Sequence, residues 1–572
     1  MSKQRRYLKS VCLFFCFAVT IGIQLWNMPP LHNWLIGDDS VYHYLRVDAV
    51  AERLRCGDFF SEVNHVFFEG FGYADFANPI LFLYIPALFR VMGCGIGASM
   101  TLFLILCCIL TYVVMYVSVK NISGSPIAGT IAAVLYSLSQ YRTDSLFTRF
   151  ALGEVLAFIF WPLVLWGLYD LIAREGKRLW PLGLGLGGML LSHSLSTYLV
   201  CLICVIFCLV FIKRIVTDAG KWQRLLLTAG LTLALTAFYW IPFLRFVIQH
   251  DLTLFYPNTV TADNTVDPVY LFSNVSISAT QAGIGAILLF AASSRLLLGS
   301  RSPLAEPMRK DGVDVRWLDT CLLTGLITLF CATDLAPWKL LGILLNSLQF
   351  SFRLYTIVTV CLAVAGGICL YYVLRASKVK YIGTLVICAA CILSSCMHYH
   401  HIAPRYGESP PDDYFYATPA SRVVCNGEWL PLQAKKWVIE WEQHPKLLEL
   451  SDGTRPTYTR ARDTITFPVE KPCAYADLPL VWYHDYKAYA ANGQELPVTA
   501  NEQGLVRVDV TDITGDVTVT YVVSFATKAA YALSFITAAS LLTIVIVTNV
   551  RRKKKTPNED AVSADVPSGA AS

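Results

Sequence analysis

Apolar and polar positions alternate along this chain on two very different length scales. Apolar runs begin near residue 8 and recur to residue 549, and most of them approach the roughly 20 residues that an α-helix needs to cross a bilayer. One long polar stretch, 398–527, separates the last run from the others. This pattern predicts a polytopic α-helical membrane protein with a large polar insert before its final transmembrane helix.

Basic residues between the apolar runs predict how the chain crosses the membrane, because loops rich in Lys and Arg stay in the cytoplasm. Treating 79–93 as a re-entrant or interfacial helix, in keeping with its short length and its Pro79 and Pro86, places every basic loop on one side. About twelve spans then remain, with both termini cytoplasmic. They are expected near 8–28, 98–118, 127–139, 153–172, 180–193, 198–213, 225–248, 278–298, 317–334, 354–375, 381–397 and 528–549.

The polar insert has the period-two alternation of β-strands. Leu505–Val510 and Val517–Val522 alternate apolar and polar residues between Gly- and Pro-containing stretches. We therefore expect four parts: a transmembrane domain over 1–397 with a first external loop at 29–97, a β-sandwich-like ectodomain over 398–527, a last helix over 528–549, and a basic, disordered cytoplasmic tail over 550–572. The basic start, Met1 to Lys9, is interpreted as part of an uncleaved signal anchor.

Composition supports a membrane protein and argues against nucleic-acid binding. Of the 572 residues, 55% are hydrophobic and only 15% are charged, whereas soluble proteins carry about 25% charged residues. The net charge of +5 comes from basic residues at the ends of apolar segments, where they act as topology signals. We expect the lipid bilayer, and no nucleic acid, among the partners.

Cysteine and histidine clusters offer only weak signals for metal binding. Cys201, Cys204 and Cys208 share one helix face, where packing is the favoured interpretation over a metal site. His398-Tyr399-His400-His401 lacks a decisive fourth ligand and is interpreted by default as an ordinary juxtamembrane cluster. Cys425 and Cys473 both fall in the polar insert, where an external location makes a disulfide plausible.

The clearest candidate chemistry lies in the first external loop, within Gly37–Arg46. Asp38 and Asp39 are adjacent, and Asp39, His43 and Arg46 share one face of a helix expected to end near Gly57. One of the two aspartates can cap this helix, which leaves the second acid and the histidine unexplained. A charged cluster at a membrane face is a candidate functional site.

Further charged and polar residues fall at other external helix ends. The second external loop, 140–154, carries Arg142, Arg149 and Glu154, and Glu154 also suits the positive end of the helix that it begins. An arginine beside aromatic residues at a membrane edge suits a lipid phosphate, or simply snorkels. Together the candidate binding residues are His43, Arg46, Arg142, Arg149, Glu154, His193, Arg245, Gln349 and Arg353.

With these motifs the chain resembles the GT-C superfamily of membrane glycosyltransferases. Asp38–His43 is similar to the first acidic motif of oligosaccharyltransferases, while Arg142–Asp144 matches their second acidic loop poorly. A closer resemblance is to bacterial 6-pyruvoyl-tetrahydropterin-synthase-related, YfhO-like membrane proteins. It rests on the Asp-plus-His start, Gly70–Phe76 before Asn78-Pro79, Tyr141-Arg142 with Arg149 and Gly153-Glu154, Ser192–Ser196, Gln349-Phe350 with Arg353, and Leu478–Tyr483.

The resemblance implies a catalytic aspartate that takes a proton from the acceptor hydroxyl. That role passes to Asp39, with Asp38 as its rival, and Arg353, then Arg149 and His193, would meet the charge of a lipid phosphate. A divalent metal is left open.

The expected function is transfer of a sugar from a polyprenyl-phosphate-linked donor to an envelope glycan or polymer outside a bacterial plasma membrane. A lipid-linked glycan transporter or flippase, and a non-catalytic membrane scaffold, are the alternatives.

Overall fold

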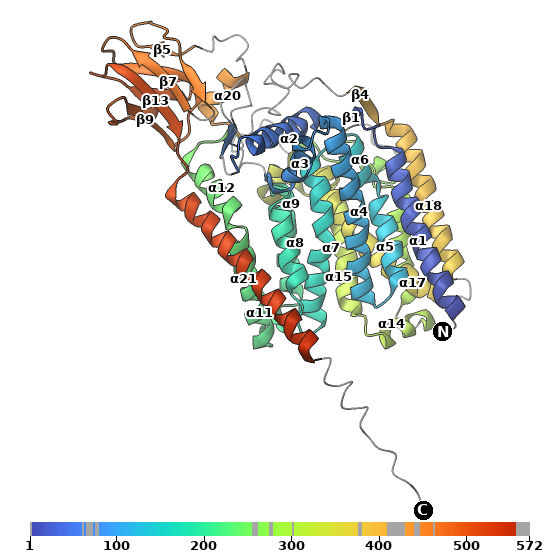
Figure 1. The fold of residues 1–572 in the computed structure, drawn as a ribbon. Coiled ribbons are helices and arrows are strands. Elements are labelled where there is room, and N and C mark those ends of the chain that lie inside the picture. Colours follow the sequence, from blue (N-terminus) through green and yellow to red (C-terminus); the bar gives the residue numbers. More distant parts are fainter. Residues whose placement is uncertain are drawn as a thin grey trace, which may run out of the picture.

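The protein is mostly helical, with a β-rich region near its C-terminal end (Figure 1). The computed structural model describes residues 3–59, 62–64, 73–74, 79–253, 261–273, 278, 280–299, 302–375, 380–408, 429–439, 447–461 and 464–555. Most of the motif 70–78 and the tail 556–572 lie outside these residues.

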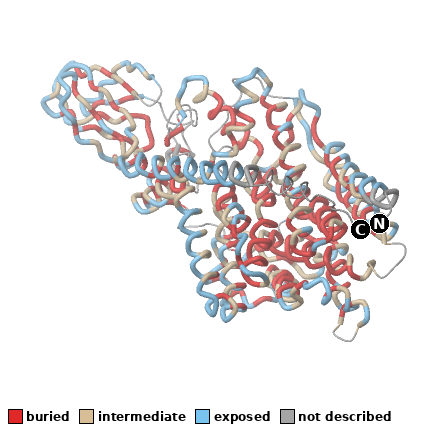
Figure 2. The backbone as a smooth tube through the Cα atoms, turned by 60° about the horizontal axis from the view of Figure 1, so that its bottom comes forward, coloured by how far each residue is buried: buried red, intermediate tan, exposed pale blue. Residues whose placement is uncertain are grey.

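The helical part is a bundle around two central helices, α7 (Leu152–Ala173) and α17 (Tyr355–Arg375). Their apolar windows are 94% and 83% buried, against 11% for the last helix, α21 (Phe525–Lys555). Figure 2 shows the same contrast between a buried bundle interior and the exposed final helix. The other bundle helices are α1 (Lys3–Trp26), α4 (Ile96–Ser123), α5 (Pro126–Ser137), α8 (Trp180–Leu190), α9 (Ser194–Val210), α13 (Ala286–Ser293), α15 (Val315–Cys331), α16 (Trp338–Leu345) and α18 (Lys380–Ile402).

Each predicted span contains a helix, but the count of twelve spans is not confirmed. Five described helices are long and apolar enough to cross a membrane, or six with one bent pair: α4, α7, α17 with the preceding turn, α18, α21, and the pair α11–α12. Helices α5, α9 and α13 are apolar but shorter than the roughly 20 residues of a full span. The segment expected to be interfacial forms a short 3₁₀ turn, η3 (Leu81–Leu83), and α3 (Tyr84–Val91).

The predicted span 225–248 is not one straight helix. It is divided into α11 (Ala219–Leu235) and α12 (Ala237–Gln249), which meet at a bend of 75°. Ser534 of α21 stabilises the break, because its hydroxyl donates to the Ala234 carbonyl at 3.1 Å and accepts from the Phe238 N–H at 2.9 Å. A broken helix at membrane depth requires such partners for its freed backbone groups.

The β-rich region that was expected near the C-terminal end contains two larger sheets. One sheet has the order β10-β9-β13-β7-β6 and the other β11-β12-β8-β5, and all their pairings are antiparallel. Apolar residues from both sheets share one core. The strands are β5 (Glu449–Leu450), β6 (Thr459–Ala461), β7 (Thr464–Val469), β8 (Tyr475–Val481), β9 (Tyr486–Ala490), β10 (Glu495–Leu496), β11 (Val498–Ala500), β12 (Leu505–Asp509) and β13 (Gly515–Tyr521).

The predicted start of this domain, residue 398, is wrong. Helix α18 continues to Ile402, and the strand after it, β4 (Arg405–Glu408), pairs with β1 (Asn33–Ile36) near the N-terminus. A further helix, α20 (Leu432–Ile439), contributes Ala434 and Val438 to the core shared with the sandwich. The polar residues just after 398 belong to the exposed end of α18, and they do not indicate the start of a new domain.

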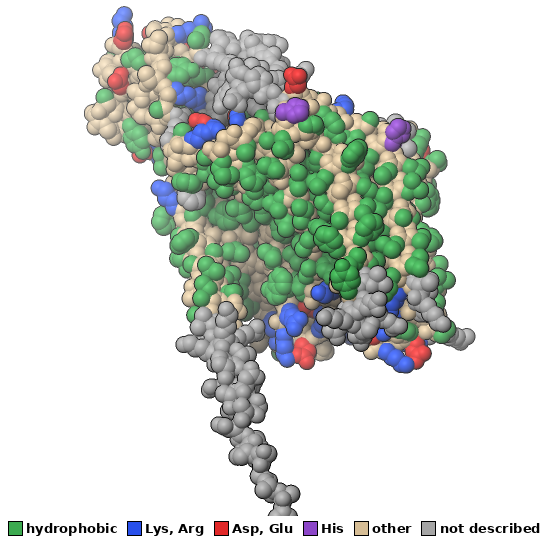
Figure 3. All heavy atoms as spheres, turned by 45° about the vertical axis from the view of Figure 1, so that its right-hand side comes forward, with side chains coloured by type: hydrophobic (Ala, Val, Ile, Leu, Met, Phe, Trp, Pro, Cys, Tyr) green, Lys and Arg blue, Asp and Glu red, His purple; other side chains and the backbone are tan. Residues whose placement is uncertain are grey.

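The two ends of the bundle differ in charge. In Figure 1 the N-terminus, α14 (Glu306–Lys310) and the end of α21 lie on one side, opposite the sandwich and α2 (Ser40–Arg55). Lys and Arg side chains gather along that lower edge in Figure 3. Ion pairs form there both within one helix end, as between Arg174 and Asp170 at 2.6 Å, and between segments, as between Arg295 and Asp319 of α15 at 2.6 Å. The N-terminus, α14 and the end of α21 lie on the same side of the bundle, as the topology argument predicts. The assignment of this side to the cytoplasm stays a prediction.

Gly37 allows the acidic turn between β1 and α2 to approach another loop closely. The Asp38 N–H donates to the Thr148 carbonyl at 3.3 Å, and the Asp39 N–H to the Arg149 carbonyl at 2.9 Å. A Cβ at position 37 would lie 2.7 Å from the Phe150 Cβ and 2.9 Å from the Thr148 carbonyl oxygen. No side chain fits there without moving the backbone, so glycine is required by the contact itself.

We therefore expect Gly37→Ala to separate the acidic turn from the 148–150 loop. Overpacking of this kind destabilises a folded protein by about 1–3 kcal/mol. We expect any activity that needs both loops to fall by at least the factor that corresponds to this free energy. Gly22→Ala is the matched control, because a Cβ there meets nothing within 4 Å. Thermal unfolding in detergent measures both variants, and equal melting temperatures for the two would contradict the close contact.

Candidate functional site at the outer end of the bundle

Four segments, two of them consecutive in sequence, meet beside α2, on the same side as the sandwich. They are α6 (Gln140–Phe147) with the loop after it, the first turn of α7, the loop between α8 and α9, and the 3₁₀ turn η10 (Ser351–Leu354) before α17. All four lie at helix ends, where backbone groups and polar side chains are available. These segments carry most of the residues singled out by the sequence.

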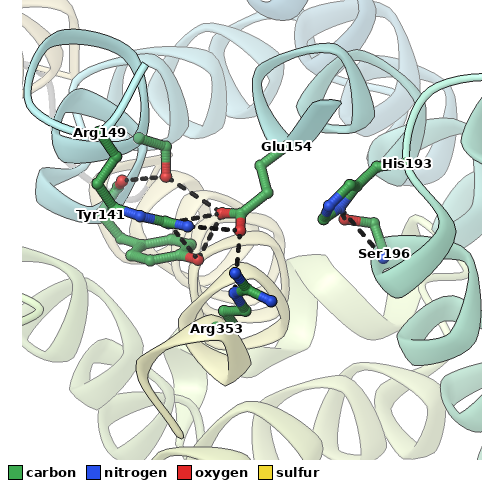
Figure 4. A network of polar contacts seen from close by, with 7 residues as sticks. Tyr141, Arg149, Glu154, His193, Ser196 and Arg353 are labelled. Carbon is green, nitrogen blue, oxygen red and sulfur yellow. Dashed lines mark hydrogen bonds and ion pairs between the residues drawn. The ribbon is translucent and has the colours of Figure 1, made fainter. Parts of the chain in front are cut away.

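Glu154 is the centre of this site (Figure 4). Its side chain is only 3% exposed and forms a two-point pair with Arg149, whose Nη1 and Nη2 lie 3.0 and 3.1 Å from Oε2 and Oε1. The Tyr141 hydroxyl donates to Oε2 at 2.6 Å, and the Ser145 hydroxyl lies 3.4 Å from the same oxygen. Arg353 approaches Oε1 from the other side, with Nε at 3.7 Å. One carboxylate therefore faces two guanidinium groups.

Aromatic rings hold the two arginines in place. The Arg149 guanidinium lies over the Phe352 ring, 4.9 Å from its centroid, and Arg353 lies over Phe350 at 5.7 Å. The two phenylalanine rings stack on each other at 5.2 Å. Stacking of this kind orients a planar guanidinium and leaves its N–H groups directed to one side.

The backbone is strained on both sides of the cluster. Phe150 and Gln349 have φ values of +54° and +67°, a region that residues other than glycine rarely adopt. Phe150 follows Arg149 directly, and Gln349 precedes the turn that carries Arg353. Strain of this kind persists where the surroundings hold it and is concentrated at functional sites.

Both aspartates lie within electrostatic reach of Arg149. Asp39 is half-buried and Asp38 is exposed. Burial lowers the pKa of Arg149, but Glu154 and Tyr141, and to a smaller extent Asp39, outweigh this and raise it. The pKa of Asp38 is raised by desolvation, against the effect of Arg149 and Arg405. The adjacent Asp39 is not among the causes of the Asp38 shift.

The helix expected after these aspartates is confirmed as α2, which ends at Arg55 just before Gly57. Asp39 occupies the N-cap position, yet its side chain makes no capping hydrogen bond. Helix capping therefore does not account for Asp39.

His43 and His193 lie near each other beside the cluster and are both uncharged at neutral pH. Burial lowers the pKa of His43 well below its usual value, with Arg46 and His193 adding to the effect. Burial also lowers the pKa of His193, to about 4, although Glu154 opposes it. The Nδ1 atom of His193 pairs with Ser196, through the hydroxyl at 2.9 Å and the backbone N–H at 3.4 Å. Its Nε2 is therefore the nitrogen able to face a ligand.

His193 packs closely on the helix that carries Glu154. A Cβ at Gly153 would lie 2.8 Å from Cδ2 of the His193 ring. The glycine before Glu154 thus brings the histidine and the carboxylate onto the same wall.

Three of the predicted binding residues have other partners. Arg142 is buried in the bundle, where its Nη1 donates to Gln24 Oε1 at 2.6 Å and to the Ser137 carbonyl at 3.0 Å. Arg245 pairs with Asp485 of the sandwich at 3.2 Å. Arg46 donates to the Pro79 carbonyl at 3.0 Å, at the far end of the face that starts with Asp39. We leave Arg142 and Arg245 out of the proposed site, because their partners hold them elsewhere.

Two contacts at this end of the bundle were missed by the sequence analysis. Tyr141 and Ser145 are four residues apart, and both reach Glu154 because 140–147 is helical and not the loop that was expected. Asp144, on the same helix, lies 2.6 Å from Nε2 of the buried His398. The i, i+4 spacing of Tyr141 and Ser145 was the available signal for a helix, but the polar composition of 140–147 suggested a loop.

The suggested metal and disulfide sites are only partly described. His398 is buried while His400 and His401 are exposed. Among the described residues, no group of three His, Cys, Asp or Glu side chains is arranged to hold a metal ion. Cys425 lies outside the described residues, so its disulfide with Cys473 stays a prediction.

Comparison with known proteins gives distant similarities. No protein-family model matches the chain. An uncharacterised protein of Lactococcus lactis subsp. cremoris is 23% identical over 228 residues, which are 37% of this chain and 36% of that protein. The chain therefore spans about a third of the curated relative that it matches.

Three solved glycosyltransferases have weakly similar structures. The arabinofuranosyltransferase AftD from Mycobacteria matches 72% of this chain and 29% of its own, at 17% identity and a TM-score of 0.46. ArnT from Cupriavidus metallidurans bound to undecaprenyl phosphate matches 77% and 70%, at 16% identity and a TM-score of 0.39. The Archaeoglobus fulgidus oligosaccharyltransferase matches 77% and 60%, at 14% identity and a TM-score of 0.43. At these scores the similarities leave the function to be argued from the site itself.

Proposed function

We propose that this protein is a GT-C-type membrane glycosyltransferase of the bacterial plasma membrane, of the YfhO-like kind. It would transfer a sugar from a polyprenyl-phosphate-linked donor to an envelope glycan or polymer on the extracytoplasmic face. The observation that carries the proposal is the half-buried pair of arginines, Arg149 and Arg353, around Glu154 and beside the Asp38-Asp39 turn.

The charges of this cluster suit a phosphate group. Glu154 compensates one of the two guanidinium charges, and the nearby Asp39 also acts on Arg149 by raising its pKa. Both arginine side chains are 16% exposed, so they remain accessible from the site while water is largely excluded. Charge-assisted hydrogen bonds are strong in such surroundings, and guanidinium groups match phosphate oxygens in shape. The Nε2–H group of neutral His193 would add a donor without adding charge.

Asp39 is the candidate base of the proposed reaction. Its carboxylate would accept the proton of the acceptor hydroxyl as the hydroxyl oxygen attacks the anomeric carbon. The bond between that carbon and the phosphate oxygen breaks, and the electron pair leaves with the lipid phosphate. Arg353 and Arg149 would stabilise the negative charge that develops there. The charges lie at helix ends and not along the middle of the helices, which favours an enzyme over a flippase.

Donor binding by Arg353 tests this proposal. We expect Arg353→Gln to weaken binding of a polyprenyl-phosphate sugar by about 10- to 100-fold, since a hydrogen bond to a charged group contributes about 1.5–3 kcal/mol. The measurement uses purified protein in lipid vesicles with a radiolabelled donor, followed by release of the labelled sugar from its carrier.

Arg375→Gln is the matched control, because Arg375 lies at the end of α17 opposite the turn that carries Arg353, and pairs with Asp311. We expect its donor affinity to stay within about twofold of the wild type. Equal affinities for both variants would contradict a phosphate site at Arg353. Movement of intact donor across the vesicle membrane without sugar release would favour a flippase instead.

A further inference from the structure

A second cavity lies between α3, α12 and α21 and also contacts the loop between α8 and α9 through Leu191. Its volume is about 400 Å³, within the range of small-molecule sites. The lining residues are Phe59, Glu62, Pro79, Ile80, Leu81, Tyr84, Leu191, Phe238, Tyr239, Pro242 and Tyr531. Apart from Glu62 and the tyrosine hydroxyls, these are apolar side chains.

The cavity lies at the edge of the helical bundle. Helices α12 and α21 run side by side there (Figure 1), and α21 exposes most of its apolar surface. In the proposed membrane orientation this surface faces lipid. Exposed apolar side chains also occur on the α3 side, including Leu81 at 39% and Leu88 at 51% exposed. A ligand with an apolar body could enter from the bilayer.

Two polar atoms in the wall of this apolar cavity lack a protein partner. Glu62 is 4% exposed and Tyr239 is 5% exposed. Oε1 of Glu62 and the Tyr239 hydroxyl make no hydrogen bond within the described part of the chain. The other carboxylate oxygen of Glu62 accepts from the Tyr521 hydroxyl at 3.0 Å, which holds the side chain in place. Buried polar groups normally have a partner, because leaving one unpaired costs about 1–3 kcal/mol.

We propose that this cavity binds an uncharged lipid whose head group carries a hydroxyl. The apolar walls would take its chain, Glu62 would pair with the hydroxyl, and Tyr239 would supply a second hydrogen bond. A lipid alcohol or a neutral glycolipid has this chemistry.

Anionic lipids fit this cavity poorly. A phosphate or carboxylate head group would meet the carboxyl group of Glu62, and none of the described lining residues is a lysine or arginine. Burial raises the pKa of Glu62, with Tyr521 and Thr527 opposing the shift. The site is thus distinct from the arginine cluster, and the inference does not depend on the proposed glycosyl transfer.

Photolabelling distinguishes the two kinds of lipid. The probes are a diazirine-bearing long-chain alcohol and the fatty acid of the same length, used with the full-length protein in neutral vesicles at pH 7.5. We expect the alcohol to label peptides of α12 or α21 at least tenfold more than the acid, and an unlabelled long-chain alcohol to compete. Equal labelling by the two probes would overturn the proposal.

Three variants locate the ligand. Glu62→Gln keeps a hydrogen-bonding side chain and removes the charge, so acid labelling should rise to the level of alcohol labelling. Tyr239→Phe removes only the hydroxyl and should reduce alcohol labelling several-fold. Leu191→Trp fills the cavity and should abolish labelling by both probes.

Glu495→Gln, at an exposed site in the sandwich, is the matched control and should change nothing. Alcohol labelling that survives Leu191→Trp in folded protein would place the lipid outside this cavity. Acid labelling that stays low in the Glu62→Gln variant would show that Glu62 does not select the head group.

Discussion

Asp39→Asn is expected to reduce sugar transfer by about 10²- to 10⁴-fold, the usual contribution of a general base. Asparagine has nearly the same shape but accepts no proton at neutral pH. The Asp39 backbone N–H would still donate to the Arg149 carbonyl, and no capping hydrogen bond of the side chain would be lost. The defect should therefore appear in the chemical step and leave donor binding within about threefold of the wild type.

Asp38→Asn is the matched control for this prediction. Asp38 is exposed and donates its own backbone N–H to the same loop, through Thr148. We expect its variant to keep at least a tenth of the wild-type rate. Initial rates of transfer from a polyprenyl-phosphate sugar, measured at saturating donor, separate the two variants. The reverse order of effects would make Asp38 the base, and normal rates in both would remove the base from this turn.

Glu154→Gln is expected to have the largest effect on stability. The carboxylate accepts from Arg149, Tyr141 and Ser145 and lies 3.7 Å from Arg353, while its side chain is only 3% exposed. Removing one partner of a buried ion pair leaves an uncompensated charge and typically costs about 3–5 kcal/mol. Here two guanidinium groups lose the same partner.

Denaturant unfolding in detergent measures this loss. The control is Glu175→Gln, whose carboxylate is 74% exposed and pairs with Lys177 at the opposite end of the bundle. We expect the control to stay within about 0.5 kcal/mol of the wild type. The double variant Glu154→Gln with Arg353→Gln should recover part of the loss, since it removes one of the unpaired charges.

A lipid phosphate connects this prediction to function. In the Glu154→Gln variant, an added polyprenyl phosphate would become the counter-ion of both arginines and stabilise the folded state by mass action. We therefore expect it to raise the melting temperature of the variant more than that of the wild type. A loss below about 1 kcal/mol for Glu154→Gln, with no response to the phosphate, would contradict the cluster as the charged centre of the site.

The general architecture could be predicted because it follows from local patterns. A long apolar run must form its own backbone hydrogen bonds in a bilayer, so it becomes a helix whatever surrounds it. Period-two alternation in 505–522 likewise predicted strands of the sandwich. The sequence also singled out Glu154 and Arg353 because charged groups at the ends of apolar segments require a reason to be there.

The break between α11 and α12 could not be predicted in the same way. Its backbone groups are satisfied by Ser534, roughly three hundred residues further along the chain. Pro242 is a local signal for a kink in 225–248, but nothing local identifies Ser534 as the partner of the freed backbone groups. The count of twelve spans is not confirmed: α5 and α13 are apolar and pack into the core shared by the bundle helices, but both are shorter than a full span.

The sequence by itself determined that the long apolar runs form helices, that 505–522 forms strands, and which helix ends carry charge. Only the tertiary structure decided which of those charges meet. Arg142 and Arg149 are both arginines of the predicted second external loop, and the sequence does not distinguish them. In the structure Gln24 holds Arg142 inside the bundle, while Arg149 pairs with Glu154. The physical reason is that helix-end chemistry depends on contacts between segments far apart in sequence, while helix formation depends on residues three and four positions apart.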